Sequence, residues 1–152
     1  MARAENAGRL ESERPSPGDD GVLCIYREGR AGRKALADLR ALAGEGHPVT
    51  VLVEVPQADP ARCWAAGTFE YNTAVREDGE RELGNARGAL AGAHDIRYAL
   101  LFERDGGALM RWLAPHSFRR VLLATERRGL ARRLQVRRVR RACRAPVRVF
   151  TP

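Results

Sequence analysis

The chain has 152 residues, of which 44% are hydrophobic and 30% charged, the composition of a single folded globular domain. Its formal net charge is +8, and residues 118–152 hold twelve of the 27 basic side chains but one of the 19 acidic ones. No apolar run is long enough to cross a bilayer, and the start lacks the hydrophobic stretch of a secretory signal. Cys24, Cys63 and Cys143 form no CxxC pair, so we expect no disulfide framework, no zinc site, no membrane partner and a cytoplasmic location.

Residues 1–20 are polar, contain proline and acidic residues and show no periodicity, which predicts a disordered tail before a domain over 21–152. The apolar run "VLCIY" (22–26) has the length of a buried strand. Apolar residues spaced three or four apart over 35–43 predict an amphipathic helix that ends at "GEGHP". The β-branched segment "VTVLVEV" (49–55) predicts a second strand, and the short strand–helix–strand run indicates a parallel crossover.

The second half of the chain continues the alternation of apolar strands and helices. After an irregular loop over 56–72, we expect a helix over 73–90 that three glycines weaken. A strand over 95–103 follows, and Asp105 is placed to cap a short helix that includes Leu109, Trp112 and Leu113 and ends near Pro115. The remaining expected elements are a strand over 119–124, an arginine-rich helix and a strand over 146–150. This order predicts an α/β fold, namely a three-layer α/β/α sandwich with a five-stranded parallel sheet.

The arginine-rich segment is amphipathic when it is placed on a helix at about 100° per residue. Arg132 and Arg138 break its apolar side near the edges, where we expect the stems to lie on the sheet and the charged heads to lie in water. The other arginines fall within one outward stripe, so the segment belongs to the domain and is not a free basic tail. The stripe consists of Arg133, Arg137, Arg140, Arg141 and Arg144.

The C-terminal part, "VLLATERRGLARRLQVRRVRRACRAPVRVF", resembles the universal stress protein family. That family ends in an apolar strand, a glycine-rich loop, a helix that opens near "GL", and an "APCPV" segment before a final strand. Here "RRGLARRL" and "RACRAPVRVF" occupy those places, and "VLCIYREG" matches the first strand and loop. The resemblance covers residues 21–151 and implies the family's fold, a stress-response or regulatory role and a homodimer.

The family's ATP-binding pattern is largely missing from this chain. ATP-binding members carry an acidic residue after the first strand and G-x2-G-x9-G-[S/T] after the fourth, because glycine lets the backbone approach phosphate. Here Arg27 takes the acidic position, Ala124 takes the first glycine, and the second falls at Glu126 or Arg127. Gly129 survives near the loop but lies outside the diagnostic positions. We therefore expect no cofactor, and a degenerate nucleotide site that has lost ordinary ATP binding.

Arginines offer an alternative way to hold a phosphate at this place. In a doubly wound sheet the ligand crevice lies at the carboxyl ends of the strands beside the switch point, which the family's strand order puts at strands one and four. Guanidinium groups bind phosphate through bidentate hydrogen bonds, so ATP or another phosphorylated ligand is the alternative. We prefer the interpretation that these arginines are solvated loop residues. They are Arg27, Arg30, Arg33, Arg127 and Arg128.

No residue stands out as catalytic, so we expect a protein that is not an enzyme. His47, His94 and His116 show no ligand-like spacing to another histidine or cysteine, which argues against a metal site. The chain has neither a nucleophile elbow nor a Walker motif. The acidic residues Glu80 and Glu82 are expected on a solvated helix face.

The C-terminal elements suggest two modes of binding. The resemblance implies a homodimer that pairs the last strands at Val147, Arg148, Val149 and Phe150, and an edge strand with alternating apolar residues suits that contact. Alternatively, the arginine stripe binds nucleic acid or another polyanion. Against nucleic acid, no aromatic residue interleaves the stripe and no helix-turn-helix pattern precedes it. We therefore favour protein contacts, with an unknown protein partner.

Overall fold

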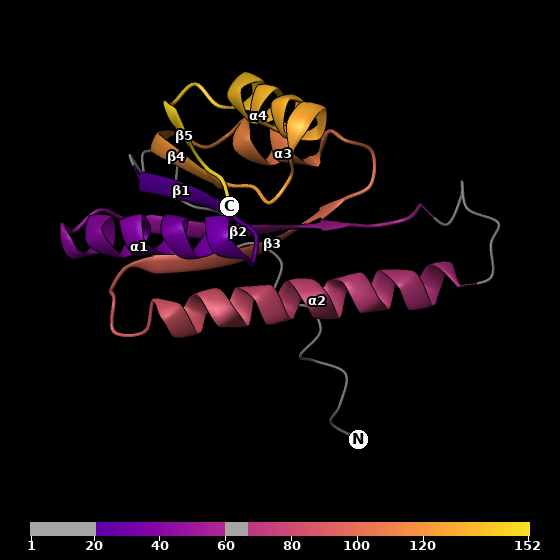
Figure 1. Ribbon diagram of the computed structural model, residues 1–152, viewed down its shortest axis with the longest axis horizontal. Coiled ribbons are helices and arrows are strands. Elements are labelled where there is room, and N and C mark those ends of the chain that lie inside the picture. Colours follow the sequence, from indigo (N-terminus) through magenta and orange to yellow (C-terminus); the bar gives the residue numbers. More distant parts are fainter. Residues whose placement is uncertain (1–20, 60–66) are drawn as a thin grey trace.

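Strands and helices alternate through the described residues of the computed structural model, which are 21–59 and 67–152 (Figure 1). Each strand and each helix that the sequence predicts is present in this part of the chain. The predicted tail over 1–20 and Cys63 lie outside the described residues. The elements are β1 (Gly21–Tyr26), α1 (Arg30–Gly44), β2 (Val49–Pro56), α2 (Thr68–Ala89), β3 (Ile96–Glu103), α3 (Ala108–Leu113), β4 (Phe118–Ala124), α4 (Gly129–Ala142) and β5 (Val147–Phe150).

The strands of the described residues form one parallel sheet in the order β3-β2-β1-β4-β5. β1 lies at its centre, where Cys24 is in register with Val51 of β2 and with Leu122 of β4. The chain therefore winds outward from β1 to β3, returns to the other side of β1 and ends at β5. The switch point lies between β1 and β4, and β3 and β5 form the two edges.

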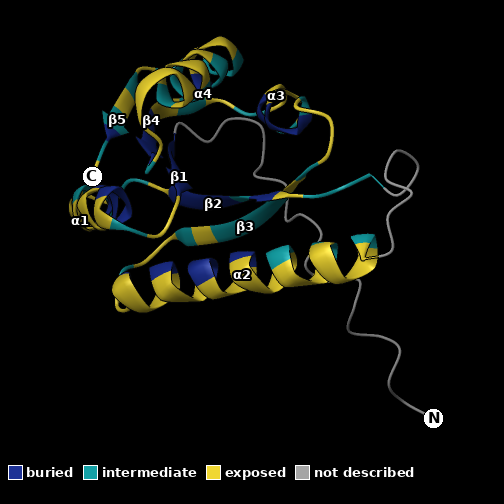
Figure 2. Ribbon diagram, turned by 45° about the vertical axis from the view of Figure 1, so that its right-hand side comes forward, coloured by how far each residue is buried: buried dark blue, intermediate teal, exposed yellow. Residues whose placement is uncertain are grey.

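Helices α1 and α2 cover one face of the sheet, and α3 and α4 cover the other (Figure 1). All of β1 is buried because its side chains alternate between the two faces. Val22, Cys24 and Tyr26 pack in the cluster under α1 and α2, while Leu23 and Ile25 pack under α3 and α4. Figure 2 shows this burial in the central strands, with exposed residues along the outer sides of the helices. The predicted three-layer sandwich is confirmed.

Helix α2 begins at Thr68, several residues before the predicted start at residue 73. Gly67 precedes it in the left-handed conformation, with a φ of 107°, and Glu70 places negative charge near the positive end of the helix dipole. Residues 68–72 contain no glycine or proline, so the helix extends through a segment expected to be loop. Although α2 has 22 residues, none of the helices in the described ranges is both long enough and apolar enough to cross a membrane.

Two acidic side chains, and not Asp105 alone, cap the start of α3. The helix begins at Ala108, and Gly107 is its N-cap residue. The amide of Ala108 donates to Glu103 Oε2 at 3.1 Å, and the amide of Gly107 donates to Asp105 Oδ1 at 3.0 Å. Glu103, the last residue of β3, therefore serves the first helical amide, which the sequence did not indicate.

Candidate functional site

A crevice opens at the carboxyl ends of β1 and β4, where open α/β sheets bind their ligands. Its volume is about 370 Å³. The loops after β1 and β4, the ends of β2 and β3, and one side of α4 form its walls. The lining residues are Arg27, Glu28, Glu54, Pro56, Glu103, Ala124, Thr125, Glu126, Arg127, Gln135 and Arg138.

Most of the site residues predicted from the family's nucleotide motif meet in this crevice. Arg27 follows β1, Ala124 ends β4, and Glu126 and Arg127 lie in the loop after it. Gly129 is the first residue of α4 and does not line the crevice. The positions named by the motif therefore surround one space, while the glycine that survives in sequence lies outside it.

The arginine-lined mouth considered from the sequence forms only in part, because Arg27 and Arg127 line the crevice but the other three arginines do not. Arg30 and Arg33 are exposed on α1, Arg128 is exposed before α4, and none of them lines the crevice. The crevice arginines are Arg27, Arg127 and Arg138. Two of these three are paired with glutamates of the same chain.

Arg27 forms an ion pair with Glu82 of α2. Its Nη1 donates to Glu82 Oε1 at 2.8 Å, and the amide of Glu28 donates to Glu82 Oε2 at 3.1 Å. Glu82 is only 7% exposed, so the prediction that it lies on a solvated face is wrong. A buried carboxylate requires a charged or hydrogen-bonding partner, which explains why Arg27 turns toward α2. Burial, followed by the charges of Glu28 and Glu82, raises the pKa of Tyr26 to about 12.

The carboxylate of Glu126 lies at the N-terminus of α1. Its Oε1 accepts a hydrogen bond from the amide of Ala31 at 2.7 Å. Gly29 precedes the helix with a φ of 140°, and a Cβ at that position would overlap the Glu126 carboxylate. Free amides and the positive end of the helix dipole favour an anion at such a place. Glu126 thus supplies, from within the chain, the negative charge that a ligand would bring to this helix end.

Arg138 reaches from α4 to the ends of β2 and β3. Its Nη2 donates to both carboxylate oxygens of Glu54, at 2.8 and 2.9 Å, and its Nη1 lies 3.8 Å from Glu103 Oε2. The Arg138 side chain is 32% exposed and those of both glutamates 14%, so the expectation that this guanidinium lies in water is wrong. The guanidinium of Arg138 therefore links α4 to the carboxyl ends of β2 and β3. Because it carries one positive charge between two carboxylates, this wall of the crevice keeps a net negative charge.

Side-chain hydrogen bonds fix the loop after β4. The Oγ1 of the buried Thr125 donates to Gln135 Oε1 at 2.6 Å and accepts from the amide of Arg127 at 3.2 Å. The guanidinium of Arg127 is exposed and forms no ion pair within the described residues. Among the described arginines that line the crevice, Arg127 is therefore the one left free to bind an anion.

Acidic residues outnumber basic ones along the crevice. Four glutamates and three arginines line it. Because Arg27 and Arg138 are already paired, a triphosphate would meet more negative than positive charge at short range. Two of the three crevice arginines are thus already engaged in ion pairs within the chain.

The histidines lie at the amino ends of the strands, whereas the crevice lies at their carboxyl ends. His47, His94 and His116 each stand shortly before a strand, at the amino ends of β2, β3 and β4. His116 stacks on the Trp112 ring with centroids 4.7 Å apart and contacts the Trp112 carbonyl oxygen.

Cys24 is buried in β1, and this burial raises its pKa to about 12. Within residues 21–59 and 67–152, no group of three histidine, cysteine, aspartate or glutamate side chains is placed to hold a metal ion.

The predicted dimer residues form β5, at one edge of the sheet. Val147 and Val149 pack against the cluster under α3 and α4, and Phe150 is 8% exposed in the other cluster. Arg148 donates to Asp38 of α1, and its guanidinium lies 5.0 Å from the centroid of the Phe150 ring. The side chains of β5 are thus engaged within the chain, whereas its outer backbone edge pairs with no strand of the described residues.

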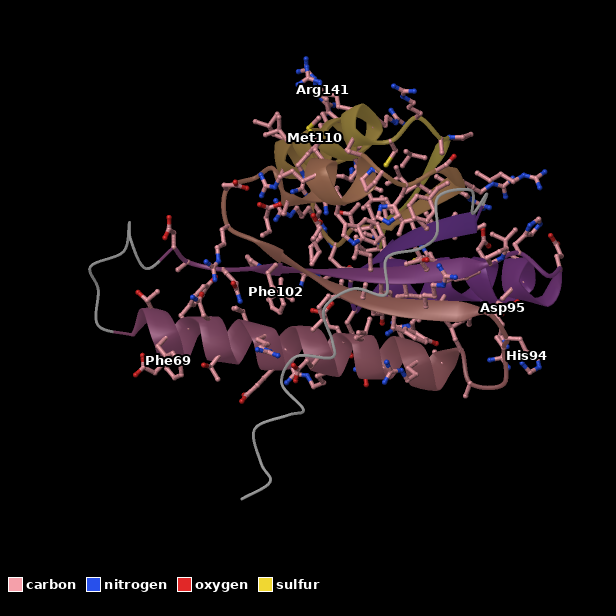
Figure 3. The ribbon with its side chains drawn as sticks, turned by 180° about the vertical axis from the view of Figure 1, so that it is seen from behind. Phe69, His94, Asp95, Phe102, Met110 and Arg141 are labelled. Atoms are coloured by element: carbon pink, nitrogen blue, oxygen red, sulfur yellow. The ribbon has the colours of Figure 1, made fainter. Side chains whose placement is uncertain are left out.

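Four arginines of the predicted stripe lie on α4, whereas Arg144 lies beyond the last helical residue, Ala142. Arg133, Arg137, Arg140, Arg141 and Arg144 are all exposed, and none of them forms an ion pair within the described part of the chain. Figure 3 shows Arg141 projecting away from the body of the molecule. Leu130 and Leu134, 70% and 55% exposed, lie on the same side of the helix as this stripe.

Sequence reasoning missed several crevice residues. Glu54 and Glu103 stand at or near the last positions of two strands, and this location was a usable signal because the carboxyl ends of parallel strands meet at one edge. Gln135 and Arg138 belong to α4, and the sequence does not show how that helix is rotated against the sheet. The missed residues therefore include the acidic ones that determine the charge of the crevice.

Comparison with known proteins establishes the fold. No family model matches this sequence, and no curated protein matches it. A universal stress protein family structure from Burkholderia pseudomallei superposes with a TM-score of 0.57 at 18% identity, over 88% of this chain and 97% of that one. UspA from Lactobacillus plantarum superposes with a TM-score of 0.55 at 12% identity, over 86% of this chain and 97% of that one.

A third solved structure, of a hypothetical protein studied as a test case of structural genomics, has a TM-score of 0.64 at 10% identity. The alignment covers 88% of this chain and 96% of that one. The chain therefore has the universal stress protein fold over nearly the full length of these structures, as its C-terminal sequence pattern predicted.

Proposed function

We propose that this protein is a non-enzymatic, homodimeric scaffold of a stress response or of its regulation, which acts in the cytoplasm without a cofactor. In this proposal it has lost ordinary ATP binding and works through protein contacts. The observation that carries the proposal is the position of Glu126, whose carboxylate occupies the N-terminus of α1 at the switch-point crevice. A fixed carboxylate at that place competes with the phosphate of any nucleotide and repels it.

The pairing of the crevice arginines supports the same reading. Arg27 is paired with Glu82 and Arg138 with Glu54, so the charges of both arginines are neutralised by partners within the chain. A phosphorylated ligand at the crevice is the alternative, and it would depend chiefly on Arg127. If a phosphorylated ligand binds here, replacing Arg127 with alanine must abolish that binding without unfolding the protein.

Thermal unfolding with ATP and Mg²⁺ tests the loss of nucleotide binding. A ligand at a hundred times its Kd adds about 2.7 kcal/mol, which moves the midpoint of a domain of this size by roughly 5–10 °C. We expect a shift below about 1 °C with millimolar ATP and Mg²⁺, compared with Mg²⁺ alone as the control. A shift of about 5 °C that requires ATP would contradict the proposal.

The variant Glu126→Ala sharpens this test because it removes the carboxylate from the end of α1. If the carboxylate is what excludes phosphate, ATP should stabilise the variant more than it stabilises the unchanged protein. Glu80→Ala is the matched control, since Glu80 is an exposed glutamate on α2 that pairs with Arg76.

The dimer is proposed to form along the outer edge of β5. Within the described residues the backbone groups of that edge pair with no strand, and an antiparallel contact between two copies would satisfy them across a two-fold axis. Light scattering coupled to size-exclusion chromatography should give twice the monomer mass at micromolar concentration. A monomer at every concentration would contradict this part of the proposal.

Polyanion binding through the α4 arginine stripe is a second candidate function. The exposure of all five stripe arginines favours it. A nucleic-acid partner would be held by phosphate contacts, so its binding would fall steeply as salt is raised. Titration with a DNA duplex at two salt concentrations measures this directly.

A further inference from the structure

The outer face of α4 carries positive charge with no counter-charge of its own. The helix has six arginines and no acidic residue. Arg138 turns inward to Glu54, whereas the other exposed arginines form no ion pair within the described residues. We define the α4 outer face as Leu130, Arg133, Leu134, Arg137, Arg140 and Arg141.

Two exposed leucines lie within this basic surface. Leu130 and Leu134 are one helical turn apart, and the turns that follow place Arg137 and Arg141 along the same line. Single exposed leucines are common on protein surfaces, but here two adjacent ones are 70% and 55% exposed beside a row of cations. Met110 of the neighbouring α3 is 53% exposed in the same layer (Figure 3). The face thus offers apolar contact at one end and positive charge along the rest.

We propose that the α4 outer face docks an acidic amphipathic segment of a partner protein. In this complex the carboxylates of the segment meet Arg137 and Arg141, and its apolar side chains cover Leu130 and Leu134. The segment is expected to be acidic because its charge must complement that of the arginines. It is expected to carry apolar side chains because these would cover the two exposed leucines. The proposal rests on the scaffold function only in that both act through protein contacts, and it uses a different surface from the crevice and the β5 edge.

Nucleic acid fits this face less well than a protein segment does. Phosphates would pair with the arginines but would leave both leucines uncovered, and α4 has no aromatic residue on which a base could stack. An anionic membrane also fits less well. A helix that lies on a membrane has its charged residues opposite a broad apolar face, whereas the side of α4 opposite its outer face, which includes Val136 and Val139, is packed against the sheet.

Fluorescence anisotropy with a designed peptide tests the proposal on the full chain. The probe is a labelled amphipathic helix of about 15 residues with leucines and glutamates on one face. We expect saturable binding that weakens when NaCl rises from about 50 to about 150 mM. Arg137→Glu with Arg141→Glu should weaken binding by at least about tenfold, and Leu130→Ser with Leu134→Ser by about fivefold.

The control is Arg119→Glu with Arg120→Glu, which makes the same charge change at exposed positions of β4 and should alter binding by less than about twofold. Absence of saturable peptide binding, or leucine variants that bind normally, would overturn the proposal. Tighter binding to a random-sequence DNA duplex, or to phosphatidylserine vesicles, would overturn it in favour of those partners. Stabilisation by ATP would count against the scaffold function and leave this result unchanged.

Discussion

Helices α2 and α4 lie on opposite faces of the sheet, and both are rich in charge, but they use that charge differently. α2 has three arginines and five acidic residues, which pair along the helix as Arg76 with Glu80 and Arg81 with Asp78. α4 has six arginines and no acid, and Arg138 is its one ion-paired residue among the described contacts. Two of the three arginines of α2 are therefore paired within their own helix, whereas most of the charge of α4 is available to a partner.

The largest expected effect is a difference in the free energy of unfolding between variants of two adjacent arginines of α4, Arg138 and Arg137. Arg138→Ala should lower the free energy of unfolding by about 2 kcal/mol, because it leaves the carboxylates of Glu54 and Glu103 without their cation in a largely buried position. Arg137→Ala should change it by less than about 0.5 kcal/mol, because this side chain is exposed and unpaired within the described residues. Urea denaturation of both variants measures the difference, and equal losses would contradict the distinction between inward and outward arginines.

The same pair of residues shows what the sequence could predict. Apolar runs of strand length and helical spacing gave the order of elements and the exposed stripe of α4, because these patterns depend on local geometry. Arg138 and Glu82 were predicted wrongly because their partners lie 84 and 55 residues away in the chain. Such pairing depends on how each helix is rotated and placed against the sheet, which a single sequence does not show.

For the crevice, the location could be predicted from the sequence better than the charge of the lining residues. Arg27 and Arg127 were identified from the family's motif, and both line the crevice. Glu126 was identified from the same motif, but its contact with α1 was not, and the acidic residues at the ends of other strands, Glu54 and Glu103, were missed. The charge of the site therefore follows from tertiary contacts that no motif encodes.

An intermediate effect is expected from two glycines of α2. Gly79 is buried, and a Cβ there would overlap Val55 Cγ2 and lie 3.4 Å from Leu100 Cδ2. Gly79→Ala should therefore destabilise the protein by about 1 kcal/mol, since overpacking outweighs the gain in helix propensity. Gly84 faces open space, so Gly84→Ala should stabilise by about 0.5–1 kcal/mol. Opposite shifts of the urea midpoint would show that α2 is fixed by close contact with the sheet at Gly79, whereas two stabilising substitutions would contradict that contact.

The smallest expected effect concerns Arg111 of α3, which, unlike the outer arginines of α4, has a carboxylate partner in its own layer. Its hydrogen bond to Asp105, followed by that from the Gly107 amide, lowers the pKa of Asp105 to about 2. Because this pKa lies below the ordinary value of 3.8, the pair stabilises the folded state above pH 4, and the contribution is lost as the pH falls toward 2.

Arg111→Gln should therefore raise the pKa of Asp105 toward 3.8 and flatten that part of the acid denaturation curve. Carboxyl NMR titration of Asp105 measures the pKa, and Arg104→Gln is the matched control because Arg104 bonds to Gln57 instead. An Asp105 pKa that stays near 2 in the Arg111 variant would mean that the Gly107 amide holds it alone. Arg111 would then be as free as the outer arginines of α4, and the available positive charge would extend across the whole layer formed by α3 and α4.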